Sequence, residues 1–277
     1  MTGFVNVFKP EGMSSAQVVN RVKRLFKTPC GHMGTLDPLA CGVLPVGVGN
    51  AARLFDYFLK KEKRYSARFV FGATTETLDR EGEIVAGGRV PSAREIEEAL
   101  PVFVGTIMQT PPRYSAVSVN GRRGYDLARS GADFELAAKQ VTVSAFRLTG
   151  QTAPDEFCSA IVCGGGPYIR SLARDLAAAL GTQGYMSYLC RTASGPFTQE
   201  TSVAFDALSA ERAATFLIPT DSVLPFPVLT CEDARIFHGV SVPVSCADGP
   251  YKLYREGEFY GIARVAGGMA RAEKKLC

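Results

Sequence analysis

The sequence predicts an α+β protein in which a large mixed domain precedes a small β-rich module. Up to Pro219, segments with the two-residue period of strands alternate with segments that have the apolar spacing of amphipathic helices. Proline then becomes frequent, and a short helix near residues 232–237 and several short strands follow. This shift places the boundary between domains 1–222 and 223–277. With 277 residues, 46% hydrophobic and 21% charged, the chain can bury a sizeable core and is not disordered.

The first elements are predicted from their starts and stops. Residues 4–8 are typical of a short strand, and Ser14 or Ser15 can cap a helix that runs to about residue 26. A glycine-rich loop comes next, and an apolar strand over residues 43–48 follows it.

The middle of the domain continues with a helix, a strand and a capped helix. Asn50 can cap an amphipathic helix, and Ser92 with Glu95 forms a capping box for a later one. Residues 64–72 predict a strand with one buried face, because alternate positions are apolar: Tyr65, Ala67, Phe69 and Phe71.

The last part of the domain is predicted to be a hairpin, strands and one long helix. Asn120-Gly121 supplies the positive φ values of a hairpin turn. A helix begins near Tyr168 and stops at Gly181. Strands are expected over residues 141–148, 156–163 and 191–197.

Charge, cysteine content and the N-terminal sequence bound the class of protein. The net charge of +4 is mild, and the cations gather in two clusters that suit phosphate backbones, although each could be a solvated helix face. The clusters are Arg21, Lys23, Arg24 and Lys27, and Lys60, Lys61, Lys63 and Arg64. Eight cysteines form no Cys-x-x-Cys pair and His32 and His238 are the two histidines, so a zinc site has few ligands. We expect reduced cysteines in a cytoplasmic protein that has neither a signal peptide nor a membrane span.

The most informative segment is the loop Gly31-His-Met-Gly-Thr-Leu-Asp37-Pro-Leu-Ala-Cys-Gly42. Its glycines allow the backbone to approach a ligand closely, and its apolar residues can shield the Asp37 carboxylate from water. On its own the segment is also compatible with an ordinary Asp-Pro turn. The remaining blocks of the chain decide between these interpretations.

Six blocks, in order, resemble the TruB family of pseudouridine synthases. They are Lys9-Pro-Glu-Gly-Met-Ser-Ser15, the Asp37 loop, Lys63-Arg-Tyr65 with Phe71-Gly72 and Thr75-x-Thr77-x-Asp79-x-x-Gly82, Gln109-Thr-Pro-Pro-Arg-Tyr-Ser-Ala116, Tyr168-Ile-Arg-Ser-Leu172, and Leu189-Cys-Arg-Thr192 with Ser194-Gly-Pro-Phe197. Any one block is weak evidence, but six in sequence are specific. The resemblance loosens after about residue 222.

The resemblance implies a fold, a reaction and a substrate. The fold is a mixed, largely antiparallel sheet flanked by helices, followed by a small PUA-like RNA-binding module. The reaction is the isomerisation of uridine to pseudouridine at position 55 in the T-loop of tRNA, without cofactor or metal. The partner is the T-arm of tRNA, with no guide RNA and no membrane, and we expect a monomer.

The resemblance also assigns the chemistry. Asp37 matches the catalytic aspartate, which either attacks ribose C1′ or removes the C2′ proton. Arg170 matches its ion-pair partner, and a buried carboxylate without a partner is costly by several kcal/mol. The alternative interpretation is that Arg170 is an ordinary surface arginine on the first turn of a helix.

Further residues are assigned to the target base. Tyr65 matches the tyrosine that stacks on the base and handles the C5 proton, Tyr168 and Leu189 match positions lining the uracil pocket, and His32 matches the residue that helps to displace the base. All four could instead be core or structural residues. Flipping a base out of its stack costs a few kcal/mol, which an inserted side chain can help to offset.

The cations complete the predicted interface. Arg21, Lys23, Arg24, Lys61, Lys63 and Arg64 are expected to contact phosphates and position the T-arm. The chain departs from the family at four positions. Gly165 and Pro167 stand where family members often have lysine and threonine, and Cys190 and Ala193 stand where arginine is frequent. These departures remove charge near RNA, but none removes a residue that the chemistry requires.

Two other functions remain compatible with this fold. One is a non-catalytic RNA-binding or tRNA-folding protein, which loss of the Asp37 or Arg170 position would favour. The other is a guide-RNA-dependent relative, a class that usually carries a longer C-terminal module and basic tails. The sequence favours the stand-alone synthase.

Overall fold

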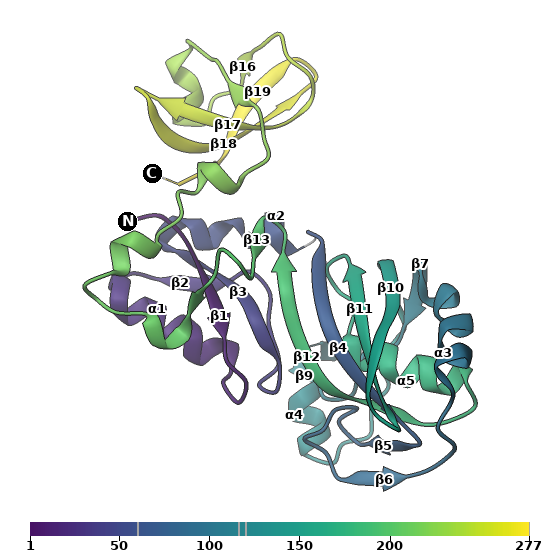
Figure 1. Ribbon diagram of the computed structural model, residues 1–277. Helices are drawn as coiled ribbons and strands as arrows, with labels where there is room; N and C mark the ends of the chain where they lie inside the picture. The colour runs from purple at the N-terminus through teal and green to yellow at the C-terminus, as the bar shows by residue number, and fades with distance from the viewer. Residues whose placement is uncertain (60, 116, 120, 277) are drawn as a thin grey trace.

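The computed structural model describes residues 1–59, 61–115, 117–119 and 121–276, which form a large body and a small C-terminal module (Figure 1). Within these residues the body contains a ten-stranded sheet, whose main path is β14-β1-β3-β12-β4-β11-β10-β7. The strands of this path are β1 (Gly3–Lys9), β3 (Cys41–Val48), β4 (Lys63–Phe71), β7 (Gly105–Gln109), β10 (Lys139–Ala153), β11 (Glu156–Cys163), β12 (Gly184–Ser194) and β14 (Val203–Ala204).

The sheet is mixed and largely antiparallel, which confirms the predicted fold class. Of its pairings in the described chain, β1 with β14 and β3 with β12 are parallel, and the others are antiparallel. Two short strands lie off the path: β2 (Cys30–His32) pairs with β3, and β13 (Phe197–Thr198) pairs with β12. Two small hairpins are separate, formed by β5 (Ala73–Thr75) with β6 (Ile84–Ala86) and β8 (Ser118–Val119) with β9 (Arg122–Arg123).

Helices flank the sheet. The α-helices are α1 (Ser15–Phe26), α2 (Phe55–Leu59), α3 (Ala93–Ala99), α4 (Gly124–Arg129) and α5 (Ile169–Ala179). Helix α5 packs on β12 and β4, whereas α1 packs on β1, β2 and β3 (Figure 1). The 3-10 helices are η1 (Gly49–Leu54), η2 (Leu100–Phe103), η3 (Phe205–Ala207), η4 (Ala213–Phe216), η5 (Asp221–Val223) and η6 (Ala234–His238).

The start of α1 follows from its sequence. Ser14 caps the helix by accepting from the backbone N–H of Gln17, whose side chain in turn binds the backbone N–H of Ser14. Val18 and Val22 are fully buried against the sheet, which leaves the basic residues on the outer faces. The predicted helix is confirmed, with Ser14 rather than Ser15 as its cap.

Three predicted elements differ from the structure. The helix expected after Asn50 begins as η1 at Gly49, and Asn50 instead donates to the Leu276 carbonyl. The strand predicted over residues 191–197 begins at Gly184, because β12 is central and buried on both faces, where alternation is lost. The short C-terminal helix is the 3-10 helix η6. Asn120 of the predicted hairpin turn lies outside the described residues.

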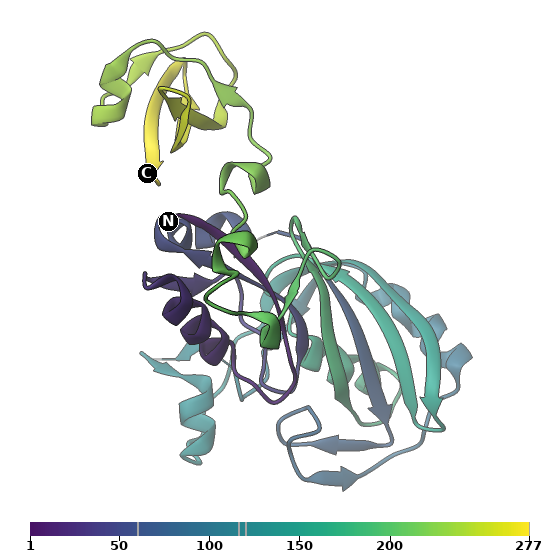
Figure 2. The ribbon, with the colours of Figure 1, turned by 60° about the vertical axis from the view of Figure 1, so that its left-hand side comes forward.

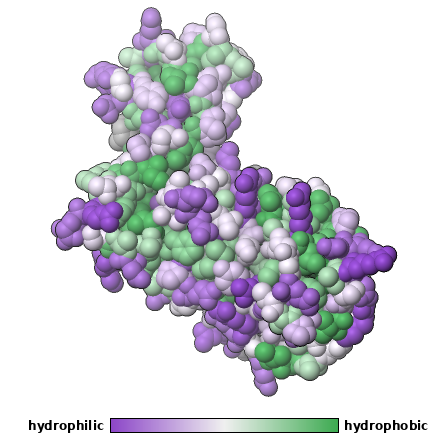
Figure 3. All heavy atoms as spheres, in the orientation of Figure 1, coloured by the Kyte–Doolittle hydropathy of each residue, from purple (hydrophilic) through white to green (hydrophobic). Residues whose placement is uncertain are grey.

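The C-terminal module has its own sheet and core. Its five-stranded sheet is built from β15 (Val228–Leu229), β16 (Val242–Pro243), β17 (Gly249–Arg255), β18 (Glu258–Ala266) and β19 (Met269–Lys275). Figure 2 shows the module standing above the body, with the two chain termini near the junction. There Ile262 and Leu276 share a buried cluster with Phe4 and Leu54 of the body, and apolar surface gathers at this waist in Figure 3. Within the described chain, no helix combines the length and apolar character needed to span a membrane.

Candidate active site

Asp37 lies in the loop between β2 and β3, which several contacts hold in place. The Ser15 hydroxyl, at the start of α1, donates to the Leu36 carbonyl at 2.8 Å and accepts from the Leu36 backbone N–H at 2.9 Å. Lys9 Nζ donates to the Pro38 carbonyl on the other side of Asp37. The backbone on both sides of Asp37 is therefore fixed by side chains from distant parts of the chain.

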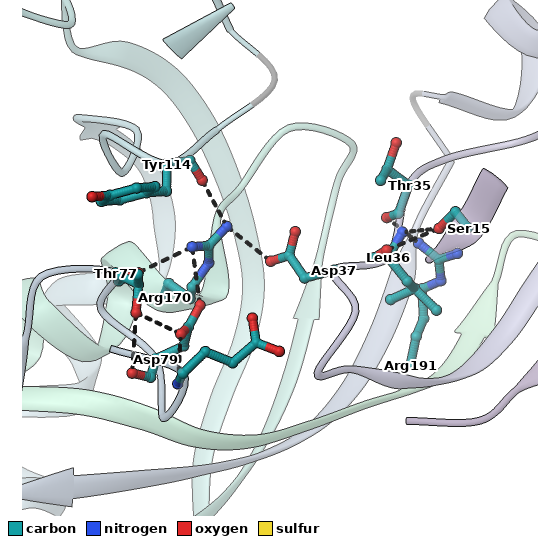
Figure 4. Close-up of polar contacts among 10 residues, drawn as sticks. Ser15, Thr35, Leu36, Asp37, Thr77, Asp79, Tyr114, Arg170 and Arg191 are labelled. Carbon is teal, nitrogen blue, oxygen red and sulfur yellow. Dashed lines mark hydrogen bonds and ion pairs between the residues drawn. The ribbon is translucent and has the colours of Figure 1, made fainter. Parts of the chain in front are cut away.

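Arg191 holds the same loop from the opposite side. It is 1% exposed, and its guanidinium donates to the carbonyls of Gly34 and Val43 at 3.0 and 2.7 Å. It also donates to the Thr35 carbonyl at 3.2 Å (Figure 4). The planar guanidinium carries several N–H donors, so it can satisfy several carbonyl groups at once. Arg191 thus ties the loop and β3 to β12.

Arg170 joins Asp37 to a second carboxylate. Its Nη2 lies 2.9 Å from Asp37 Oδ2 and its Nη1 lies 3.1 Å from Asp79 Oδ2 (Figure 4). It also donates to the Thr77 and Tyr114 carbonyls, both at 3.0 Å. The arginine is buried, so the two carboxylates and two carbonyls replace the water that it loses.

Asp79 is as deeply buried as Arg170 and is held from the hairpin side. Its side chain is 4% exposed, and Oδ1 accepts from the Thr77 hydroxyl at 2.6 Å and the Glu81 backbone N–H at 3.0 Å. Asp37 is different: its side chain is 36% exposed, and Oδ1 has no hydrogen-bond partner in the described part of the chain. One oxygen of Asp37 is anchored and the other is available to a ligand.

A cavity of about 220 Å³ opens beside Asp37. It is lined by Gly34, Thr35, Leu36, Asp37, Lys63, Tyr65, Ser115, Gly166, Pro167, Tyr168, Ile169, Arg170, Leu189 and Arg191. Asp37, Tyr65, Tyr168, Arg170 and Leu189, which come from five separate blocks of the sequence, therefore meet at one pocket. The pocket therefore offers a ligand the aromatic rings of Tyr65 and Tyr168 and, at the edge of the pocket, the anionic oxygen of Asp37.

The aromatic groups of the pocket are kept neutral. Burial raises the pKa of Tyr65 to about 12, so its phenol stays protonated at neutral pH. Burial also raises the pKa of Tyr168. The backbone of Tyr168 is fixed by Gln109, whose side chain accepts from its N–H at 2.7 Å and donates to its carbonyl at 3.2 Å.

His32 does not line the pocket. It ends β2, opposite Val46 of β3, and is half-buried. Burial, together with the nearby positive charge of Arg191, lowers its pKa, which favours the neutral imidazole. Its Nδ1 is buried without a hydrogen-bond partner among the residues described. Its contact with a displaced base stays a prediction.

The predicted phosphate contacts divide into two groups. Lys23, Arg24 and Arg64 are exposed, Lys61 is half-buried, and Arg21 is exposed and donates to the Leu208 carbonyl. Lys60 of the same cluster lies outside the described residues. The five described residues are accessible to solvent, as contact with a polyanion requires.

Lys63 was expected among the surface cations that contact phosphates, and the structure corrects this prediction because the residue is buried. It is 5% exposed and lines the pocket, and its Nζ donates to the Lys61 carbonyl. The two-residue period of β4 explains this position: Lys63 and Tyr65 point inward, while Arg64 between them points outward. Burial, and then the charge of Arg191, lowers the pKa of Lys63 to about 8.

Sequence reasoning gave no role to Asp79, Arg191 or the interior position of Lys63. All three stand inside the blocks that carried the resemblance. The alternation of β4 was the signal for Lys63, whereas the partners of Asp79 and Arg191 are distant in sequence. In the described chain, no group of three or more His, Cys, Asp or Glu side chains is placed to hold a metal ion.

Comparison with known proteins matches this chain to one family. The family model "TruB family pseudouridylate synthase (N terminal domain)" matches residues 23–169, and "tRNA pseudouridylate synthase B C-terminal domain" matches residues 170–224. The tRNA pseudouridine synthase B of Acaryochloris marina is 40% identical, with 100% of this chain and 99% of that protein covered. That of Anaplasma marginale is 47% identical, with 80% and 73% covered.

A solved structure extends the likeness to the fold. The crystal structure of a Cbf5-Nop10-Gar1 complex contains a chain that is 24% identical, covering 99% of this chain and 85% of that chain, with a TM-score of 0.73. The fold is therefore that of the pseudouridine synthases, with a PUA-like module following the mixed sheet.

Proposed function

The chain belongs to the TruB family of pseudouridylate synthases and isomerises uridine in tRNA, and we propose that its target is the uridine at position 55, in the T-loop. It works as a stand-alone enzyme, with neither a guide RNA nor a cofactor. Isomerisation needs neither an oxidant nor an energy source, because every atom of the uridine is kept. The observation that carries the proposal is Asp37, anchored by Arg170 at the edge of a pocket lined by Tyr65 and Leu189.

Asp37 starts the reaction at the ribose. The bond from C1′ to N1 of uracil breaks, the base turns, and C1′ joins C5, which then loses its proton while N1 gains one. The ionised carboxylate either attacks C1′ or removes the C2′ proton. Both routes need a free anionic oxygen next to the sugar, and Asp37 Oδ1 supplies it while Arg170 fixes Oδ2.

Tyr65 and Leu189 hold the base during this exchange. A buried ring and an aliphatic side chain can sandwich uracil, which lets the detached base rotate without leaving the pocket. Because the phenol of Tyr65 stays protonated, it does not compete with Asp37 as a base. We propose that Tyr65 also takes part in transfer of the C5 proton.

The target uridine has to leave its stack to reach this pocket. We propose that His32, beside the loop, helps to displace the base, and that the exposed cations Arg21, Lys23, Arg24 and Arg64 hold phosphates of the T-arm. The half-buried Lys61 joins them. The shape of the arm and its single-stranded loop supply the selectivity.

The test is the release of tritium from tRNA labelled at uridine C5, with no added metal, nucleotide or guide. Asp37→Asn keeps the shape but removes the charge, so we expect turnover to fall by about 10⁴-fold or more, with tRNA affinity nearly unchanged. Asp56→Asn, on the exposed face of α2, is the matched control and should leave turnover unchanged.

The outcomes separate the mechanism from its rivals. Turnover by Asp37→Asn at the parental rate would show that the mechanism is wrong. Binding without tritium release by the parent protein would favour a non-catalytic tRNA-folding protein. Affinity should also weaken steeply as salt rises, and a flat response would exclude the phosphate contacts.

A further inference from the structure

Two cysteines face each other across the parallel pair of strands that carries the site. Cys41 begins β3 and Cys190 lies in β12, and the two are direct partners in the register of that pair. Neighbouring strands lie about 4.8 Å apart. A disulfide spans Cα atoms about 4.4–6.8 Å apart, so this register suits one.

The two thiols are already in contact but not bonded. Both cysteines are free, and their side chains lie within hydrogen-bonding reach of each other. Cys41 Sγ also lies 3.5 Å from the hydroxyl of Tyr188, the residue two before Cys190 on β12. The sulfur of Cys41 is therefore surrounded by two groups that can donate to it.

These donors favour the reactive form of Cys41. The Cys190 thiol and then the Tyr188 hydroxyl lower the pKa of Cys41, against the effect of burial. The hydrogen bond to Cys41, and then burial, raises the pKa of Cys190. Burial, and then the hydrogen bond to Cys41, raises the pKa of Tyr188. The thiolate is the nucleophile in thiol oxidation, so Cys41 is the attacking partner.

We propose that Cys41 and Cys190 are an oxidation site, which hydrogen peroxide converts to a reversible disulfide that slows the enzyme. The Cys41 thiolate attacks one peroxide oxygen and becomes a sulfenic acid as hydroxide leaves. The Cys190 sulfur then attacks the Cys41 sulfur and expels water. Two thiols and one peroxide give one disulfide and two waters, so the two electrons lost by sulfur reduce the peroxide.

The site is reachable by an oxidant of this size. Cys41 is 7% exposed and Cys190 is 5% exposed, so neither residue is completely sealed from solvent, and the proposal requires an oxidant as small as peroxide. A disulfide at this position is transient in a reducing compartment, as expected of a sensing bond.

The disulfide would act on the pocket through the strands. Disulfides most often join Cα atoms about 5.5–6 Å apart, so the bond would move these strands apart by up to about 1 Å. The strands are in close contact at this point, because a Cβ built on Gly42 would lie 2.2 Å from the Arg191 carbonyl oxygen. Cys190 also lies between Leu189 and Arg191, both of which line the pocket. We expect turnover to fall about tenfold or more in the oxidised form.

The experiment treats the full-length protein with hydrogen peroxide, then maps its thiols by mass spectrometry without reduction. The expected result is a peptide pair joined through Cys41 and Cys190, together with a loss of tritium release. Dithiothreitol should then restore both the free thiols and the tritium release. Cys190→Ala should keep its turnover under peroxide. Cys158→Ala, a half-buried cysteine on β11 of the same sheet, is the matched control and should lose turnover as the parent does.

The mapping and the turnover test different steps. Recovery of Cys41 and Cys190 as thiols, as separate sulfinic acids or in other pairings would overturn the proposed site. A Cys41–Cys190 disulfide with unchanged turnover would overturn the control of activity. The turnover measurement rests on the proposed function, whereas the mapping stands even if the substrate is a different RNA.

Discussion

The pocket is bounded by two buried arginines that are satisfied in opposite ways. Arg170, from α5, meets the carboxylates of Asp37 and Asp79 as well as two carbonyls. Arg191, from β12, meets three carbonyls and makes no ion pair within the described chain. Both side chains are at most 7% exposed, so neither is solvated in the way that a surface arginine is.

The difference separates chemistry from architecture. Arg170 sets the position of the reacting carboxylate, because one of its nitrogens holds an oxygen of Asp37. Arg191 sets the path of the loop that carries Asp37, because it binds backbone two and three residues earlier. An arginine with two carboxylates leaves the site with one net negative charge, whereas the carbonyl partners of Arg191 bring no opposite charge.

The largest expected effect is that of Arg170→Lys on turnover. Lysine keeps the charge, but its ammonium cannot hold Asp37 and Asp79 in the planar geometry of the guanidinium. We expect turnover to fall by about 100-fold or more, since displacement of a reacting group by 1 Å has an effect of that size. Tritium release under single-turnover conditions measures this, and tRNA affinity should change little.

Arg174→Lys is the matched control for this prediction. Arg174 lies one turn further along α5, pairs with its neighbour Asp175 and is about one-third exposed. It should keep parental turnover. If Arg170→Lys also keeps it, the carboxylate does not depend on a two-point contact, and the contrast between the two arginines fails.

The second effect is on stability and concerns Arg191→Met. Methionine fills a similar length of stem but leaves the carbonyls of Gly34, Thr35 and Val43 without their donor. A buried polar group without a partner costs about 1–3 kcal/mol, so the free energy of unfolding should fall by about 2–4 kcal/mol. Urea denaturation measures the change, and turnover should fall less than in Arg170→Lys.

Arg68→Met is the control, which tests whether loss of any arginine from this sheet lowers the free energy of unfolding as much. Arg68 lies on β4, its side chain is 43% exposed, and it stacks over Tyr188. We expect its loss to change stability by less than about 1 kcal/mol. An Arg191→Met protein as stable as the parent would contradict the role of Arg191 as a backbone clamp.

How well each element of the fold could be predicted depends on whether local or distant contacts determine it. The start of α1 and the inward face of β4 could be predicted, since a serine cap and a two-residue period are local signals. The start of β12 could not, because a central strand buried on both faces has no alternation. Asn50 looked like a cap, but its partner is Leu276, at the other end of the chain.

The site was predictable where a motif named the residue and not where a contact defines it. Asp37, Tyr65 and Arg170 were assigned from their blocks and meet at one pocket. The pairing of Asp79 with Arg170 spans 91 residues, and that of Arg191 with Gly34 spans 157. No periodicity reports contacts of that range, so only the folded chain brings these residues together.

The smallest expected effect is a pH dependence that reports the positive charge of Arg191. Burial, and then Arg191, lowers the pKa of Lys63 to about 8 in the folded protein from 10.5. Between these values the unfolded chain binds more protons, so the free energy of unfolding rises with pH, and below pH 8 the cost of the buried charge is fully present. Lys63→Met should flatten this rise by about 1–2 kcal/mol, as measured by urea denaturation from pH 7.5 to 10.5.

Part of the rise should survive in Lys63→Met, because burial also lowers the pKa of Lys9 to about 8. Lys139→Met, at an exposed position on β10, is the matched control and should keep the full rise. Arg191→Met should narrow the pH range over which the free energy of unfolding rises. The lower limit of that range should move up, since removing the guanidinium raises the pKa of Lys63. The same pH range in Arg191→Met as in the parent would mean that Lys63 does not sense Arg191. The charge of that arginine would then be compensated from elsewhere, and the two arginines would differ less than their contacts indicate.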